Sequence, residues 1–202
     1  MEKNDYSFSQ FLKNIPSFVI LNILWVVCSI PVFTIGASTC AAYYVTLKMV
    51  DEEEGYVGKM FVKAFKDNFK QGTFLWLLTG PSIYVCYLMW QVISKGENIH
   101  FLIITGAILF TAFVIIFSLY AFPLLARYEN TIPKTIKNSF AISTMFFPRT
   151  LFMVFIVVLE CLIFLWNRWT MLAGILLGPE LVIYTVSGIT KRIFLITENN
   201  KA

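Results

Sequence analysis

The chain has 202 residues and a formal net charge of +4, and 58% of its residues are hydrophobic whereas only 14% are charged. A soluble domain carries roughly 45–50% apolar and about 25% charged residues, and the mean hydropathy here is +0.73. These values exclude a disordered chain, a collagen-like fibre and a disulfide-rich secreted domain, and they argue strongly against a soluble enzyme. We therefore predict a single integral membrane domain over residues 1–202, with the lipid bilayer as its solvent.

Charge-free runs give the candidate membrane spans, because a helix needs about 20 apolar residues to cross a bilayer core of about 30 Å. No charged residue lies between Lys13 and Lys48, a run too long for one crossing, and Pro31 sits near its middle. The runs lack the alternation of a β-barrel, so we predict an all-α polytopic protein with six transmembrane helices. Their approximate ranges are 15–30, 35–50, 72–94, 100–125, 150–166 and 169–190. A re-entrant hairpin over 15–50 is the alternative to the first two spans.

The basic residues give the orientation of the spans, because cytoplasmic loops carry an excess of lysine and arginine. Six spans place both termini on one side, and 14 of the 16 basic residues then share that side. These are Lys3, Lys13, Lys48, Lys59, Lys63, Lys66, Lys70, Arg127, Lys134, Lys137, Arg149, Lys191, Arg192 and Lys201. Only Lys95 and Arg168 lie on the other side, so we predict a multi-pass protein of the cell membrane with both termini cytoplasmic. Glu2 and Asp5 before the first span indicate a retained anchor rather than a cleavable signal peptide.

The sequence shows no catalytic or metal-binding motif. Cys28, Cys40, Cys86 and Cys161 all fall within predicted spans, at spacings that match no metal or redox site. His100 is the only histidine, and one histidine without partners makes no zinc site. We therefore expect no enzyme activity, no metal and no cofactor.

The two inner loops, 51–71 and 126–149, are predicted to hold amphipathic helices. In the first loop Phe61, Phe65 and Phe69 share one helical face, because residues four apart are neighbours on a helix. The lysines on the flanking and opposite faces are Lys59, Lys63, Lys66 and Lys70. We expect the phenylalanines to enter the acyl boundary and the lysines to contact lipid headgroups, and docking of a partner's cytoplasmic domain is the alternative. Topology accounts for the basic residues, so no nucleic-acid binding is expected.

Two acidic residues, Glu160 and Glu180, lie within predicted spans, each about ten positions from the inner end. A carboxylate in hydrocarbon costs several kcal/mol, so such residues usually face the bundle interior and mark function. Neighbouring antiparallel spans would hold the two at similar depth, where a close pair would not ionise twice. We interpret them as neutral structural carboxyls, with a proton-coupled site as the alternative. Gly174 and Gly178 form a G-x-x-x-G pair, which favours close packing within the bundle or between two copies of the chain.

Several stretches of the first two thirds of the chain resemble YesL-like membrane proteins, in the order found in that family. They are 22–25 (NILW), 29–44 (SIPVFTIGASTCAAYY), 53–55 (EEG), 65–71 (FKDNFKQ) and 122–129 (FPLLARYE). The resemblance implies a Gram-positive membrane protein of uncharacterised function, of a kind commonly encoded beside carbohydrate ABC importers and polysaccharide-degrading enzymes. It implies no catalytic or ligand-binding residues, and it does not include Glu160 or Glu180.

We therefore expect an accessory membrane protein linked to carbohydrate ABC import, with subunits of a sugar importer as partners. No coupling motif of an ABC permease is visible, which argues against an independent permease subunit. The alternative is a small secondary transporter or channel that acts alone. Its candidate site is the small-residue stretch 34–42, where a helix N-terminus at membrane depth can meet a ligand.

Overall fold

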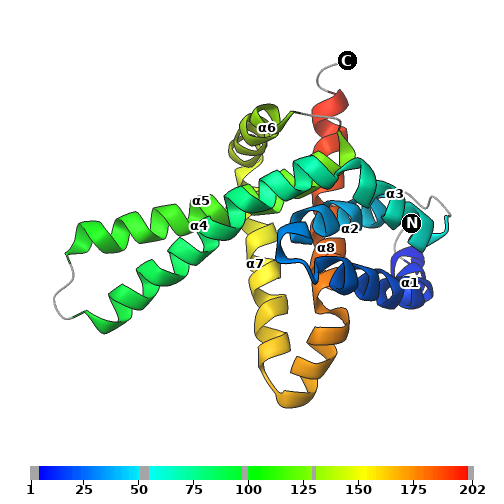
Figure 1. Ribbon diagram of the computed structural model, residues 1–202, viewed down its shortest axis with the longest axis horizontal. Coiled ribbons are helices and arrows are strands. Elements are labelled where there is room, and N and C mark those ends of the chain that lie inside the picture. Colours follow the sequence, from blue (N-terminus) through cyan, green and yellow to red (C-terminus); the bar gives the residue numbers. More distant parts are fainter. Residues whose placement is uncertain (1–4, 51–54, 97–99, 129–130, 200–202) are drawn as a thin grey trace.

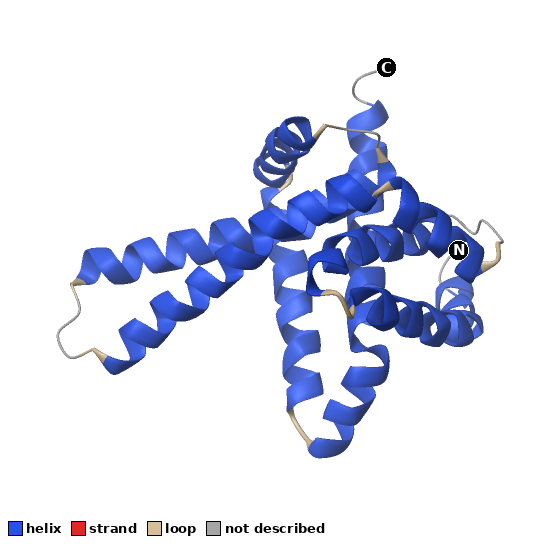
Figure 2. Cartoon of the chain, viewed as in Figure 1, coloured by secondary structure: helices blue, strands red, loops and turns tan. Residues whose placement is uncertain are grey.

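The computed structural model of the chain is built of helices (Figures 1 and 2) and describes residues 5–50, 55–96, 100–128 and 131–199, with only the backbone for 5–14. The elements are α1 (Asp5–Ser29), η1 (Val32–Thr34), α2 (Ile35–Val50), α3 (Val57–Asp67), α4 (Phe69–Lys95), α5 (Phe101–Arg127), α6 (Ile132–Met145), α7 (Phe147–Leu165) and α8 (Arg168–Asn199). None of the described residues forms a strand, so the predicted all-α class is confirmed. The terminal lysines Lys3 and Lys201 and most of the outer loop 95–99 lie outside the described residues.

The break between α1 and α2 lies where the sequence predicts it, around Pro31. Proline lacks an N–H group and disfavours helical backbone at the preceding residue, so α1 ends at Ser29. The hydroxyl of Thr34 donates a shared hydrogen bond to the carbonyl oxygens of Cys28 at 2.5 Å and Pro31 at 2.6 Å. The short turn η1 therefore supplies a donor to the carbonyl group of Cys28, in the last turn of α1.

Helix α2 lies at the centre of the fold and packs against α1, α3, α4, α5 and α8. Its small residues, among them Ser38, Ala41 and Ala42, are fully buried, and their size lets the surrounding helices approach closely. The tightest approach joins α2 to α4, because a Cβ atom on Gly36 would lie 2.0 Å from the carbonyl oxygen of Gly72. Protein, rather than lipid, therefore surrounds most of α2.

Two long antiparallel hairpins, α4–α5 and α7–α8, extend from this centre in different directions (Figure 1). The C-terminal end of α4 and the N-terminal end of α5 lie at one corner of the molecule and the turn between α7 and α8 lies at another, whereas α4, α5 and α8 all pack against α2. Within the second hairpin, Gly174 and Gly178 both face Phe164, and a Cβ atom on Gly174 would lie 2.9 Å from that side chain. The G-x-x-x-G pair therefore packs α8 against α7 within one chain.

Among the described residues, α4, α5 and α7 are each long and apolar enough to cross a membrane. Helix α8 becomes a fourth span if its two parts, Arg168–Ile175 and Leu177–Asn199, which meet at an angle of 68°, are counted as one. The apolar part of α1, Ile15–Ser29, is shorter, and α2 has only 16 residues. The chain is thus a helical membrane protein with three or four long candidate spans.

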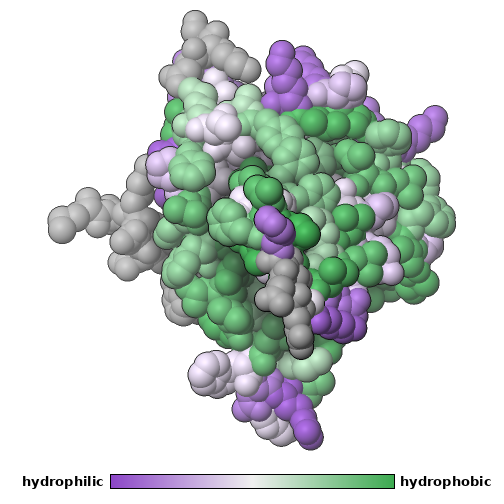
Figure 3. Space-filling view, turned by 90° about the vertical axis from the view of Figure 1, so that its left-hand side faces the viewer, coloured by the Kyte–Doolittle hydropathy of each residue, from purple (hydrophilic) through white to green (hydrophobic). Residues whose placement is uncertain are grey.

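The outward faces of the hairpins are apolar. Large side chains such as Leu77, Tyr84, Leu109, Phe155 and Leu162 are between 57% and 66% exposed. In Figure 3 apolar side chains cover most of the visible face, and the hydrophilic ones lie mainly toward its edges. A soluble monomer rarely exposes so large an apolar area, so this surface suits lipid as its solvent.

Candidate functional site

The first inner loop forms α3, and its phenylalanine face packs on the protein itself. Phe61 has no exposed surface and belongs to the hydrophobic core, and Phe65 is partly buried against the same core. The rings of Phe61 and Phe65 stack at 6.3 Å, and Phe69 meets Phe65 edge-on at 5.6 Å. The predicted shared face is therefore present, but α1 and α2 are the helices that pack against α3. The expected contact of Phe61 with lipid or a partner is wrong, because the side chain has no free surface.

The cationic side of this helix remains exposed. We call the lysine face four exposed residues: Lys59, Lys63 and Lys66 of α3, and Lys70 in the first turn of α4. The ammonium group of Lys59 lies 5.1 Å from the ring centre of Tyr56, which is 79% exposed, an arrangement typical of a cation–π contact. The aromatic side of α3 anchors this helix to the core, so Lys59, Lys63 and Lys66 are held on a packed helix with their side chains exposed, and Lys70 follows at the start of α4.

Glu180 is fully buried. Neither of its carboxyl oxygens has a hydrogen-bond partner among the described residues. Its electrostatic neighbour is Tyr43 of α2, which is also buried, so the carboxyl group faces the centre of the fold. A buried ionised carboxylate without a partner costs several kcal/mol, and we therefore expect the neutral form here.

Glu160 of α7 has a different environment. Its Oε1 accepts a hydrogen bond of 2.6 Å from the hydroxyl of Thr185, and its Oε2 is buried with no partner among the described residues. Thr185 and Glu180 are five positions apart on α8, which places them about 140° apart around the helix and about 7.5 Å apart along it. The two carboxyl groups therefore adjoin different faces of α8, and we treat them as two candidate sites rather than one pair.

The bend of α8 is tied to α1 by a hydrogen bond. Pro179 has no N–H group, so the carbonyl oxygen of Ile175, four residues earlier, loses its helical donor. The side-chain amide of Asn22 donates to this oxygen at 3.3 Å. Nearby, the rings of Phe18 and Tyr184 meet edge-on at 4.9 Å. A side chain of α1 therefore satisfies the carbonyl group that Pro179 leaves without a helical donor.

A polar cluster that no sequence motif predicts lies at the C-terminal end of α5. The Nε and Nη2 atoms of Arg127 each lie 3.3 Å from one carboxylate oxygen of Glu198, and the hydroxyl of Tyr128 donates to the same carboxylate. The guanidinium also lies over the rings of Tyr128 and Phe194. Burial, followed by the hydrogen bond to Glu198, raises the pKa of Tyr128 to about 12. A two-pronged arginine–carboxylate pair is among the stronger side-chain contacts, and here it joins α5 to α8.

The sequence marks two members of this cluster but not the third. Arg127 and Tyr128 belong to the stretch 122–129 that carries the family resemblance, whereas Glu198 lies 71 residues beyond Arg127 and belongs to no motif. Within the described part of the chain, no group of three histidine, cysteine or acidic residues is placed to hold a metal ion. The chemistry that these residues offer is hydrogen bonding, charge pairing and surface docking.

Comparison with known proteins adds one finding. No curated protein and no solved structure shows significant similarity to the chain. A family model does match, and the matched residues run from α1 into α4, so that they include the Pro31 break, α2, the lysine face and the contact between Gly36 and Gly72. Over residues 18–90, about a third of the chain, this protein is similar to the family described as protein of unknown function, DUF624.

Proposed function

We propose that the chain is a YesL-like protein of the cell membrane with six spans and cytoplasmic termini. The family match over residues 18–90 supports the first part of this proposal. The six predicted apolar runs coincide with α1, α2, α4, α5, α7 and α8, which supports the second. A 16-residue α2 is about 24 Å long, so this crossing requires local bilayer thinning. A re-entrant α1–α2 hairpin is the alternative, and it leaves the ends at Lys13 and Lys48 on the same side.

We propose that this protein is an accessory subunit that docks a partner at its inner face and is linked to carbohydrate ABC import. The observation that carries the docking proposal is that the two sides of α3 have different environments. Its aromatic side is used in the core, whereas all four residues of the lysine face are exposed. A cationic face on a fixed helix suits an acidic cytoplasmic surface, because complementary charge speeds association and selects partners. The carbohydrate link comes from the family resemblance.

Purification of the tagged full-length protein from its native membrane tests this proposal. We expect permease and ATPase chains of a sugar importer to co-purify with the wild type. Replacing the lysine face by glutamine removes four charges at nearly constant length, and we expect this variant to lose those chains. Lys134→Gln with Lys137→Gln is the matched control, because both residues are exposed on α6 at the same side of the membrane.

The outcomes of this experiment separate the two parts of the proposal. If no importer chain co-purifies with the wild type, the carbohydrate link is wrong. If the importer chains co-purify equally with the wild type and the lysine-face variant, docking through α3 is wrong. Loss in the α6 control as strong as in the lysine-face variant would show a general charge effect instead of a specific surface.

A proton-coupled transporter is the second candidate, and the burial of Glu180 favours it. A fully buried carboxyl group without a hydrogen-bond partner among the described residues can take up and release a proton if water reaches it. The other transporter site expected from the sequence, 34–42, is filled by helix packing: Ser38, Ala41 and Ala42 are buried.

Reconstitution in liposomes with a pH-sensitive dye inside tests this candidate. Glu160→Gln and Glu180→Gln keep a donor and an acceptor at nearly the same volume, so both variants should fold with wild-type helix content. Under the accessory proposal, liposomes with the wild type show no proton flux above protein-free liposomes. A flux that Glu180→Gln abolishes, in a correctly folded variant, would replace the accessory proposal by the transporter.

A further inference from the structure

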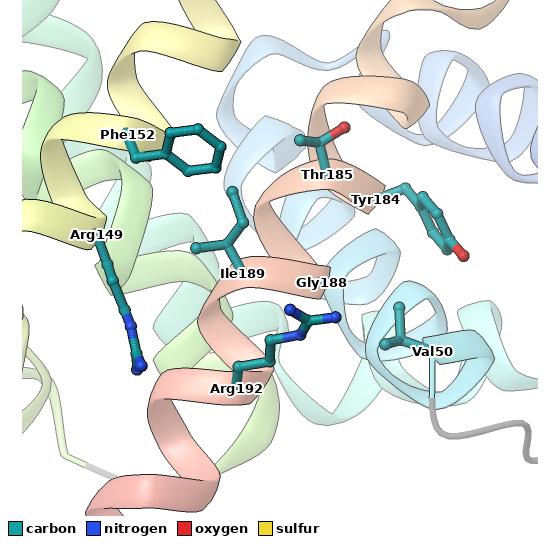
Figure 4. Close-up of a pocket in the computed structure, with 8 residues that line it drawn as sticks. All are labelled: Val50, Arg149, Phe152, Tyr184, Thr185, Gly188, Ile189 and Arg192. Atoms are coloured by element: carbon teal, nitrogen blue, oxygen red, sulfur yellow. The ribbon is translucent and has the colours of Figure 1, made fainter. Parts of the chain in front are cut away.

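The inner half of α8 forms the floor of a groove (Figure 4). Thr185, Gly188, Ile189 and Arg192 line it, and their spacing of three and four residues places them on one helical face. The groove has a volume of about 630 Å³, and its sides include Arg149 and Phe152 of α7 and Val50 at the end of α2. We call this feature the α8 groove. Its volume lies within the range of about 300–1,000 Å³ that is typical of small-molecule sites.

A glycine keeps the floor of the groove open. Apart from its chain neighbours and the adjoining backbone of α8, a Cβ atom on Gly188 would meet no atom of the described residues within 4 Å, so the space above it is open. The end of α2 is fixed beside the groove, because the ammonium group of Lys191 donates to the carbonyl oxygen of Val50 at 2.9 Å. This contact satisfies a terminal carbonyl group of α2 with a cation, as is favourable at a helix C-terminus.

Charge and apolar surface are segregated along the groove. Arg149 and Arg192 are both exposed, and they lie nearer the start of α7 and the end of α8, while Phe152 and Ile189 lie farther toward the middle of these helices. The guanidinium of Arg149 is 5.5 Å from the ring centre of Phe146. Positions 185 and 192 are seven residues apart, which is about 10 Å along the helix. The groove thus has one cation on each side toward one end, Arg149 on the α7 side and Arg192 on the side of Val50 (Figure 4), and an apolar wall toward the other end.

We propose that the α8 groove binds one anionic phospholipid of the cytoplasmic leaflet. Its phosphate would lie at Arg149 and Arg192, since arginine pairs well with phosphate oxygens, and its acyl chains would follow Phe152 and Ile189. Basic pockets between membrane helices at this side bind anionic headgroups by the same chemistry. A soluble phosphate would use only the arginines and leave the apolar wall in water, which favours a lipid as the occupant.

Binding can be measured on the full-length protein in neutral detergent. The melting temperature is recorded against increasing phosphatidylglycerol, because a ligand that binds only the folded state raises it. Phosphatidylcholine with the same acyl chains tests the apolar wall alone, and inorganic phosphate tests the cations alone. We expect phosphatidylglycerol to bind most tightly, with an affinity that falls as salt screens the arginines.

Two kinds of variant test the two ends of the groove. Arg149→Gln and Arg192→Gln should each weaken phosphatidylglycerol binding about 5-fold, and the double variant about 30-fold. Gly188→Leu should fill the groove and abolish binding without a change of charge. Gly106→Leu is the matched control, because a Cβ atom on Gly106 of α5 also has no neighbour within 4 Å. Circular dichroism establishes that each variant keeps the wild-type helix content.

Four results would overturn the proposal. Equal affinity for phosphatidylcholine would show an apolar groove without headgroup recognition, and equal affinity for inorganic phosphate would show a soluble-anion site. Unchanged phosphatidylglycerol binding by a folded Gly188→Leu would place the lipid elsewhere. A contact of the arginines within the chain is the remaining alternative, because the acidic residues 51–54, which lie outside the described structure, follow Val50 in the sequence. If the double arginine variant melts at a lower temperature without lipid and binds phosphatidylglycerol as before, the arginines serve a contact within the chain.

Discussion

Gly36→Ala should destabilise the fold, because α2 and α4 meet through their backbones at this position. A Cβ atom on Gly36 would lie 2.0 Å from the carbonyl oxygen of Gly72 and 2.6 Å from the Cβ atom of Trp76. Non-bonded carbon atoms prefer separations of about 3.5–4.0 Å, so the two helices would have to move apart by on the order of 1 Å. Neither obstructing atom is the end of a flexible side chain, so rotation of a side chain cannot relieve the clash.

The expected loss of stability follows from two opposed effects. Overpacking of this kind costs about 1–3 kcal/mol, because a gap of about 1 Å forfeits up to about half of the dispersion energy across the contact. Alanine is favoured over glycine within a helix by about 0.5–1 kcal/mol, which offsets part of this cost. With backbone atoms as the obstacle, we expect a net destabilisation of about 2 kcal/mol, or a melting temperature lower by about 4–8 °C.

Thermal unfolding of the purified variants in one detergent measures this effect. Gly106→Ala is the matched control, since it changes helix propensity in open space, and it should melt at or above the wild-type temperature. Gly72→Ala enters the same contact from α4, so the double variant with Gly36→Ala should cost less than the sum of the two single variants. Equal melting temperatures for Gly36→Ala and Gly106→Ala would refute a direct backbone contact between α2 and α4.

Three further predictions concern topology, ionisation and the α8 bend. On a cysteine-free background, an impermeant thiol reagent should label Gly96→Cys in intact cells and leave Lys201→Cys protected; the reverse pattern would overturn the topology. Subtracting the ultraviolet titration of Tyr128→Phe from that of the wild type should show a phenol with a pKa of about 12 instead of 10. The contribution of the neutral phenol to the free energy of unfolding is then complete below pH 10 and is lost as the pH rises through 12. A titration midpoint near pH 10 would contradict this. Asn22→Leu should lower the free energy of unfolding by about 0.6–1.7 kcal/mol in the wild type. The loss should be clearly smaller in Pro179→Ala, because alanine supplies the N–H group that proline lacks. An equal loss in both backgrounds would disprove the hydrogen bond.

Charges and proline delimit the apolar runs, so the bounds of some helices could be predicted, whereas α1 begins at Asp5, before the run predicted over 15–30, and α8 continues to Asn199, beyond the run predicted over 169–190. The second run was predicted over 35–50, and α2 is Ile35–Val50; the third was predicted over 72–94 and lies within α4, Phe69–Lys95. The sequence also showed that Phe61 and Phe65 share a face. It could not show what covers that face, because the same amphipathic period suits a helix on lipid and a helix on protein.

The candidate carboxyl groups show the same limit. Their depth could be predicted by counting along the spans, but the rotation of each helix about its axis depends on which neighbours it packs against. Thr185 faces α7 and Glu180 faces α2, an assignment that depends on long-range packing. Asn22 is likewise a polar residue in an apolar run, and its partner lies 153 residues away on α8, where no local pattern could identify it.

The divergence of the α4–α5 and α7–α8 hairpins makes the molecule sensitive to the thickness of its bilayer. The hairpins are joined at one end only, around α2 (Figure 1), so the angle between them is set by that junction and by the slab of hydrocarbon that both must traverse. Hydrophobic mismatch costs fractions of a kcal/mol per Å, and helices relieve it by tilting. We therefore expect the angle between the hairpins to be larger in a thin membrane and smaller in a thick one, with the change taken up near the contact between Gly36 and Gly72.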